Sequence, residues 1–187
     1  MSLSFLKSST LAAVASLTLA ACSHIATFTG TSGAQVTEKV TVHAVSAQGI
    51  GQAIGTIEFK DSAAGLVMMT QLSQLPSGPH GFHIHEKGSC DPAVKDGKMG
   101  AALAAGGHFN PMHTQHHGTP LNGHLGDLPL LNVDAQGKAN LTLIAPRLTL
   151  ADIHGLAVMI HSGGDNYADQ PKPLGGGGER IACGVIQ

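Results

Sequence analysis

Histidine is the residue type whose number and spacing point most directly to chemistry. The chain of 187 residues contains 12 histidines, and imidazole is the commonest metal-binding side chain in proteins. Two of them lie in the motif Gly81-Phe82-His83-Ile84-His85. Alternate side chains of a β-strand share one face, so His83 and His85 would point the same way in an extended segment. A His-x-His pair is a weak signal by itself, but it offers two ligands to one metal ion.

Three further segments add imidazole and carboxylate groups. They are GGHFNP, with His108; HGTP and GHLGDLP, with His117, His124 and Asp127; and MIHSGGDN, with His161 and Asp165. The spacing His-x-x-Asp brings His124 and Asp127 toward one centre, and this mixture of donors suits zinc. Each motif alone is explained by an ordinary surface or core histidine. Together, six histidines and Asp127 at the loop edges of one domain predict a transition-metal site.

The segments between these motifs have the pattern of β-strands, and no window of a dozen residues has a helical stripe. Seven or eight short strands predict an all-β fold, either a β-sandwich or a closed Greek-key barrel. Residues 134–137 are expected to form the turn of a hairpin. Two stretches rich in Gly and polar residues predict long functional loops at 86–129 and 162–179. The expected strands are residues 40–45, 53–59, 65–72, 130–133, 139–144, 156–161 and 180–186.

The composition excludes several classes of function. Charged residues make up 12% of the chain, with 10 basic residues, 12 acidic residues and a formal net charge of −2. A polybasic nucleic-acid binder and a highly charged disordered chain are therefore excluded. With no Trp, one Tyr and five Phe, the chain also lacks the aromatic platforms that stack on bases. Hydrophobic residues reach 42%, which is enough for one core and one domain.

The N-terminus has the features of an export signal. Lys7 is the only charge in residues 1–21, and an apolar run from Leu11 to Ala21 follows it. This run is too short to cross a hydrocarbon core, which needs about 20 residues, so it predicts a secretory signal peptide. The end of the run, Leu19-Ala20-Ala21-Cys22, resembles a bacterial lipobox, in which the cysteine receives the lipid. The alternative is a plain signal peptide cleaved near Ala21, with a free thiol at Cys22.

Residues 22–36 would then be a lipidated cysteine followed by a flexible tether of small and polar residues. Residues 37–187 would form the folded domain. The expected location is the bacterial periplasm, with the membrane contacted only through the lipid. With Cys22 assigned to lipid, Cys90 and Cys183 are left, and a pair in an oxidising compartment is normally joined. Chain entropy predicts a stabilisation of about 4–5 kcal/mol from such a long loop.

Six motifs, in order along the chain, resemble those of bacterial copper,zinc superoxide dismutases. The resemblance covers about residues 37–187, and it implies an eight-stranded Greek-key β-barrel. It also implies an enzyme that converts superoxide to O₂ and hydrogen peroxide by alternate reduction and oxidation of copper. The motifs are GFHIHEKGSC (81–90), AAGGHFNP (104–111), HGTP (117–120), GHLGDLP (123–129), MIHSGGDNY (159–167) and ERIACGVI (179–186).

The resemblance also implies roles for individual residues. The copper ligands would be His83, His85, His108 and His161, and the zinc ligands would be His108, His117, His124 and Asp127. His108 would bridge the two metals and, once released from reduced copper, supply a proton. Asp165 would link a copper-side histidine to a zinc-side histidine, and Arg180 would attract the anion beside the open copper position. The Cys90–Cys183 disulfide would anchor the 86–129 loop.

Some alternatives stay open. His117 is chosen as the zinc ligand because it precedes the Gly-x-Pro of the family pattern, and His116 is the runner-up. His113 and His116 are either surface residues or help to capture metal. Lys95 and Lys98 either steer the anion or lie on a solvated loop.

The function also has alternatives. A non-enzymatic envelope protein that binds copper and zinc is the alternative to the enzyme. A zinc hydrolase is disfavoured because four ligands would fill the zinc shell. A homodimer is one of the assemblies that the sequence allows.

Overall fold

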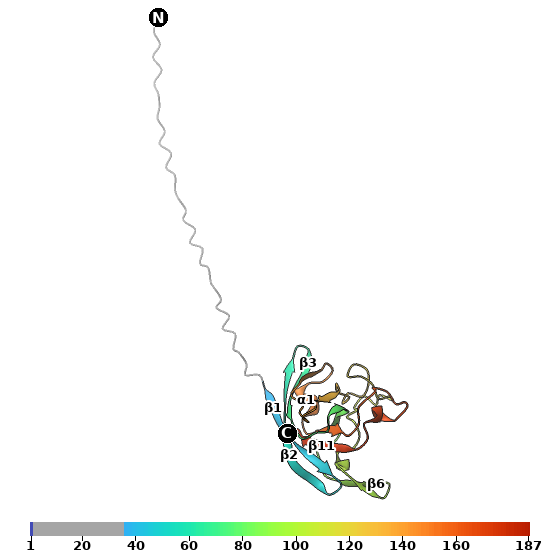
Figure 1. Ribbon diagram of the computed structural model, residues 1–187. Coiled ribbons are helices and arrows are strands. Elements are labelled where there is room, and N and C mark those ends of the chain that lie inside the picture. Colours follow the sequence, from blue (N-terminus) through green and yellow to red (C-terminus); the bar gives the residue numbers. More distant parts are fainter. Residues whose placement is uncertain (2–35) are drawn as a thin grey trace. The chain divides into compact units, whose positions relative to one another are not determined.

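Figure 1 shows the computed structural model, which describes Met1 and residues 36–187. The predicted signal peptide after Met1, the predicted lipidation site Cys22 and the tether up to residue 35 lie outside the described residues. Among the described residues, no helix combines the length and hydropathy needed to cross a membrane.

The central element is a curled antiparallel sheet in which seven strands are hydrogen-bonded in the order β5–β10–β11–β1–β2–β3–β9 within residues 36–187. Two smaller pairs, β4–β8 and β6–β7, complete the strands of this region. The strands are β1 (Thr37–Ser46), β2 (Gly49–Ser62), β3 (Gly65–Leu72), β4 (Gly78–His80), β5 (Phe82–His85), β6 (Ala93–Lys95), β7 (Lys98–Gly100), β8 (Leu131–Val133), β9 (Thr142–Ala145), β10 (Ala157–His161) and β11 (Arg180–Val185). One short helix, α1 (Leu150–Ile153), and two 3₁₀ turns, Leu103–Ala105 and Leu174–Gly176, lie between strands of this same region.

The predicted fold is confirmed. Strands β4 and β5 are separated only by Gly81 and act as one interrupted strand, while β6–β7 is an excursion of the long loop. The part of the chain described here then has eight barrel strands. Some neighbouring strands of the sheet are far apart in the chain, since β3 lies beside β9 and β5 lies beside β10, so the connections between strands must cross over the sheet. This crossing order is typical of Greek-key sandwiches and barrels.

The alternation of the strands decides which side chains enter the core. Val40 and Val42 of β1 are buried, and so are Ile57 and Phe59 of β2. Ile84 is fully buried in the same apolar cluster, so its two neighbours in β5 leave the core on the opposite face. Burial of each such side chain contributes about 1.5–3 kcal/mol. The core therefore fixes the register of β5, because a slip of one residue would place the imidazole side chains of β5 in the apolar core.

Two local predictions differ from the structure. The turn at residues 134–137 is present, but β8 pairs with β4 and β9 pairs with β3, so no hairpin ladder joins them. β9 lies at one edge of the seven-stranded sheet, beside β3, whereas β8 pairs with β4, which precedes the strand at the other edge, β5. The predicted loop at 86–129 also contains the β6–β7 hairpin, which turns through Asp96 and Gly97, both at positive φ.

The predicted disulfide is confirmed. Cys90 in the long loop is bonded to Cys183 in β11, with 5.7 Å between their Cα atoms. Both cysteines are buried with Met159 of β10 in a small apolar cluster. The bond therefore fastens the loop that carries His108, His117 and His124 to the strand that begins at Arg180.

Candidate metal centre

Backbone hydrogen bonds bring three separate segments together at β5. The amide of Ile84 donates to the carbonyl of Gly126 over 2.9 Å, and its carbonyl accepts from Phe109 over 2.8 Å. The amide of Gly126 donates in turn to the carbonyl of Phe109 over 2.8 Å. The main chain thus places His85 opposite His108 and His83 opposite Asp127. Since the neighbouring strand β10 ends at His161, residues far apart in the sequence converge on one end of the barrel.

Among the described residues, two groups of side chains have donor atoms within 4.8 Å of one another. All members are buried, and two histidines, His83 and His108, belong to both groups. The groups are His83, His85, His108 and His161, and His83, His108, His117 and Asp127. Every residue of the first group is one of the implied copper ligands, and three of the second are implied zinc ligands.

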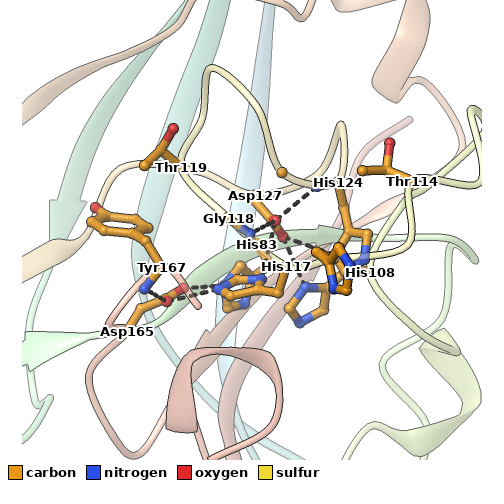
Figure 2. Close-up of polar contacts among 12 residues, drawn as sticks. His83, His108, Thr114, His117, Gly118, Thr119, His124, Asp127, Asp165 and Tyr167 are labelled. Carbon is orange, nitrogen blue, oxygen red and sulfur yellow. Dashed lines mark hydrogen bonds and ion pairs between the residues drawn. The ribbon is translucent and has the colours of Figure 1, made fainter. Parts of the chain in front are cut away.

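The Asp127 carboxylate lies at the centre of the second group (Figure 2). Its Oδ1 accepts from Nδ1 of His108 over 2.9 Å, and its Oδ2 accepts from the amides of Gly118 and His124 over 3.0 and 2.8 Å. Burial raises the pKa of this carboxyl, but the hydrogen bond from His108 and the nearby ring of His117 outweigh burial and hold the pKa below its usual range. Asp127 is therefore an anion, as a ligand for a cation must be.

Asp165 connects the two groups (Figure 2). Its Oδ2 lies 2.8 Å from Nε2 of His83, and its Oδ1 lies 2.7 Å from Nε2 of His117. Burial raises the pKa of Asp165, whereas the bonds from His117 and His83 lower it more, so the group is ionised. A carboxylate that accepts from one ring nitrogen fixes the tautomer and leaves the lone pair on the other. Asp165 therefore directs Nδ1 of His83 and Nδ1 of His117 toward their own groups.

The burial of unpartnered nitrogens tests whether these residues fit metal ions. Within the described part of the chain, Nδ1 of His83, His117 and His124 is buried and has no hydrogen bond. The Nδ1 of His117 lies 3.0 Å from Oδ2 of Asp127 but without hydrogen-bonding geometry. An unsatisfied buried polar atom costs about 1–3 kcal/mol. Buried ring nitrogens without a hydrogen-bond partner, close to a buried carboxylate, are suited to coordinate cations, so the donor set fits copper and zinc.

The first group consists of neutral imidazoles. Burial, and then the neighbouring His108, lowers the pKa of His83 to about 4. Burial also lowers the pKa of His85 and of His161 well below the usual value. A neutral ring has a lone pair for a metal, and nitrogen ligands of this kind favour copper among the divalent ions.

His108 is one of the two rings that belong to both groups. Its Nδ1 points to Asp127, and its ring stacks on His83 with 3.9 Å between centroids. It also meets His85 edge-on at 5.2 Å and His117 at 5.4 Å. One imidazole therefore lies between the all-histidine group and the group that contains the carboxylate, as a bridging ligand would.

His124 lies at the margin of the second group. Its Nδ1 is 3.4 Å from Oδ1 of Asp127, and its ring is 5.6 Å from that of His108. In the second group, His83 has a donor atom within 4.8 Å of those of the other members, and His124 is not in the group. However, Nε2 of His83 is already bonded to Asp165, so its free Nδ1 serves the first group, whereas Nδ1 of His124 is free for the second.

Arg180 lies in a cavity of about 470 Å³ beside the first group, whose lining includes His85, His108, His161 and Lys95. Its guanidinium donates to the carbonyls of Ala102 and Gly106. The carbonyl of Gly106 also lies 3.0 Å from Nδ1 of His85. The carbonyl of Gly106 thus contacts both the arginine and the histidine. The arginine places positive charge in the wall of the cavity beside the all-histidine group.

The structure separates the histidines that the sequence left ambiguous. His117 is buried in the second group, whereas His116 is exposed and pairs with Asp169 over 3.0 Å. His113 is exposed as well. On geometry, His117 rather than His116 therefore belongs to the second group. Of the two lysines, Lys95 lines the cavity while Lys98 is not among its lining residues.

Sequence reasoning missed two residues that support the site. His80 is buried, and its ring nitrogens lie 2.7 Å from the carbonyl of His161 and 2.8 Å from that of Pro76. Arg147 contacts the carbonyl of His124. Both act through main-chain carbonyls, which leave no signal in a sequence, although His80 stands next to the conspicuous motif at 81–85.

Gly175 provides a prediction for the Asp165 contacts. It is buried at φ +70°, and a Cβ there would overlap Oδ1 of Asp165 and lie 2.8 Å from Nε2 of His117. The change Gly175→Ala is expected to separate these two groups and weaken zinc binding about tenfold or more. The control is Gly176→Ala, at φ +80°, whose Cβ would meet only the side chain of Lys172 at 3.5 Å. Equal zinc affinity of the two variants, measured by chelator competition, would contradict the prediction.

Comparisons with known proteins agree with this geometry. The family model for copper/zinc superoxide dismutase matches residues 53–186. A superoxide dismutase [Cu-Zn] of Escherichia coli K12 is 56% identical over 158 residues, which are 83% of this chain and 91% of that protein. The copper/zinc superoxide dismutase of Brucella abortus superimposes with a TM-score of 0.80 at 47% identity, covering 81% of this chain and all of the other.

A third relative is the monomeric copper, zinc superoxide dismutase of Salmonella enterica, known from its solution structure. It has a TM-score of 0.73 at 53% identity, over 81% of this chain and all of that one. The match of the family model over most of the chain and these identities agree with the paired histidine groups. The chain therefore belongs to the copper/zinc superoxide dismutase family.

Proposed function

We propose that this chain is a superoxide dismutase with copper at its all-histidine group and zinc at the group around Asp127. The observation that carries the proposal is that two groups of buried side chains share His83 and His108, and that Nδ1 of His83 and of His117 in these groups is unpartnered. The copper ligands are His83, His85, His108 and His161, and the zinc ligands are His108, His117, His124 and Asp127.

The metals would supply the electron transfer, while residues of the chain hold a proton and attract the anion. When bound, copper would supply the one-electron redox chemistry by which two superoxide ions and two protons become O₂ and hydrogen peroxide, and redox-inert zinc would supply fixed positive charge. His108 would hold one of these protons on Nε2, because its Nδ1 faces Asp127 in the zinc group. His108 also lines the cavity that admits the anion.

Arg180 attracts and orients superoxide. The chain has a net charge of −2, so long-range attraction of an anion requires local positive charge. Arg180 and Lys95 place that charge in the wall of the cavity. Positive charge focused in a cleft raises the encounter rate of a small anion about 10–1,000-fold. Lys95 therefore adds to the steering, with Arg180 at the shorter range.

The variant Arg180→Ala is expected to lower the rate constant for superoxide at least about tenfold with copper still bound. The rate of the wild-type protein should fall as ionic strength rises, and that of the variant should fall less steeply. Arg180→Lys is the matched control, since it keeps the charge and loses the planar fork. Pulse-radiolysis rates over a range of salt concentrations measure both effects, and an unaltered rate in Arg180→Ala would remove the residue from the mechanism.

The proposed function is tested by metal analysis together with a superoxide-consumption assay on the purified mature protein. We expect one copper and one zinc per chain and fast consumption, which chelation of the metals abolishes. Metal uptake without consumption would instead favour a non-enzymatic envelope protein that binds copper and zinc. The filled zinc shell leaves no open position for a zinc hydrolase.

We further propose that residues 1–21 are a signal peptide and that Cys22 carries lipid, followed by a tether to residue 36 and the dismutase domain at 37–187. The sequence of the N-terminus supports this, because small residues stand directly before the cysteine at the end of an apolar run. The protein would then be anchored to the envelope and face the periplasm. A labelled fatty acid should be incorporated by the full chain and not by Cys22→Ser; equal labelling of both would contradict the anchor.

The assembly in solution is a separate question. The Salmonella enterica relative is described as monomeric, and a homodimer is the other assembly that the sequence allows. The mass of residues 37–187 in sedimentation equilibrium distinguishes the two.

A further inference from the structure

Arg147 reaches from the barrel to the loop that carries His124. One residue, Pro146, separates Arg147 from the end of β9 at Ala145, and the arginine side chain is partly buried. Its Nε donates to the carbonyl of Pro120 over 2.7 Å, and its Nη2 donates to the carbonyls of Gly123 and His124 over 2.9 and 2.8 Å. One guanidinium thus binds three carbonyls within five residues.

The main chain of His124 is held on both sides. Its amide donates to Oδ2 of Asp127 over 2.8 Å, and its carbonyl accepts from Arg147. The ring nitrogen Nδ1, in contrast, has no hydrogen bond among the described residues. The rings of His108 and His117 are oriented by carboxylates, whereas the position of the His124 ring depends on its backbone.

The contacts require arginine rather than any cation. A planar guanidinium presents several donors in a fixed fork, while the ammonium of lysine is a single point on a flexible stem. The segment 119–123 has its own turn, in which the side chain of Asn122 accepts from the amide and hydroxyl of Thr119. Arg147 therefore joins a preformed turn to the barrel wall at the residue that presents the ring.

We propose that Arg147 is a positioning residue that holds the zinc ligand His124 in place through its carbonyl. The inference rests on the proposed zinc site and extends it. It predicts that the affinity for zinc depends on a residue with no donor atom near the metal. The expected loss is about tenfold, at the lower end of what removal of an outer contact of a metal ligand costs.

The test uses copper-free protein, so that it does not depend on turnover. Zinc affinity of the wild type, Arg147→Met and Arg147→Lys is measured by competition with a chromogenic chelator. The absorption spectrum with Co²⁺ in place of zinc reports the coordination geometry. The matched control is Lys138→Met, which removes one positive charge from an exposed turn. We expect about tenfold weaker zinc binding and an altered Co²⁺ spectrum in Arg147→Met, a smaller loss in Arg147→Lys, and no change in the control.

A double-mutant cycle distinguishes positioning from general stabilisation. If Arg147 acts through His124, then Arg147→Met should cost little further zinc affinity in a His124→Ala background, and the same holds for Arg147→Lys should the methionine variant fold poorly. An equal loss in both backgrounds would overturn the inference, and so would wild-type affinity in both single variants. Failure of the wild-type protein to bind zinc would instead overturn the zinc assignment itself, together with the role of Arg147.

Discussion

Replacing His161 with alanine is expected to abolish superoxide turnover while zinc stays bound. His161 is a member of the all-histidine group, and its Nε2 lies 3.4 Å from Nε2 of His85. The group around Asp127 does not include it. Loss of an outer contact of a metal ligand costs 10–100-fold, so loss of a ligand should lower activity by more than about 100-fold. The zinc group keeps all of its donors.

The measurement is the superoxide-consumption rate together with copper and zinc content per chain. His154→Ala is the matched control, because His154 is exposed at the end of α1 and lies in neither group. Loss of copper and activity with zinc retained in His161→Ala, and wild-type values in the control, are the expected results. Full activity of His161→Ala would remove the residue from the copper ligands, and loss of both metals would show that the two groups are not separable.

Replacing Asp127 with alanine is expected to have the largest effect on zinc and on stability. The carboxylate is fully buried and accepts from His108 and from the amides of Gly118 and His124. Its removal leaves those donors without a partner in the interior. Breaking a buried charged network by removing one member costs about 3–5 kcal/mol. Zinc would also lose its carboxylate ligand, so the affinity for zinc should fall at least about 100-fold.

Denaturant unfolding with and without zinc checks this prediction. Asp134→Ala is the matched control, because Asp134 accepts two backbone amides, those of Gln136 and Lys138, in an exposed turn without a histidine. Its loss should cost only about 1 kcal/mol and leave zinc affinity unchanged. The zinc-dependent part of the stability should disappear in Asp127→Ala. An unchanged zinc content in that variant would place the zinc elsewhere.

The strand pattern was readable because it is local. The alternation around Val40 and Val42 reports which side chains face the core, and so does Ile84 between two histidines. The motif order then implied the fold, which the structure confirms. The hairpin expected at 134–137 was wrong in its pairing, because the turn is a local feature while the partners β3 and β4 come from distant parts of the chain.

The site was predictable in its members and less so in its contacts. The resemblance implied that Asp165 links a copper-side histidine to a zinc-side histidine, but the sequence did not say which two. In the structure Asp165 binds His83, 82 residues away, and His117, 48 residues away. For the adjacent His116 and His117, the sequence offered only the family pattern as a reason to choose His117, whereas the folded loop buries His117 and exposes His116.

The sequence by itself therefore determined the side-chain types, the strand periodicity and the two cysteines left to pair. The tertiary structure decided which nitrogens stay unpartnered, which carboxylate orients which ring, and that Arg147 holds the carbonyl of His124. The physical reason is the range of the forces involved. Periodicity and turn chemistry act over a few residues, whereas hydrogen bonds to main-chain carbonyls depend only on where the curled sheet brings the backbone, and every residue type has a carbonyl to offer.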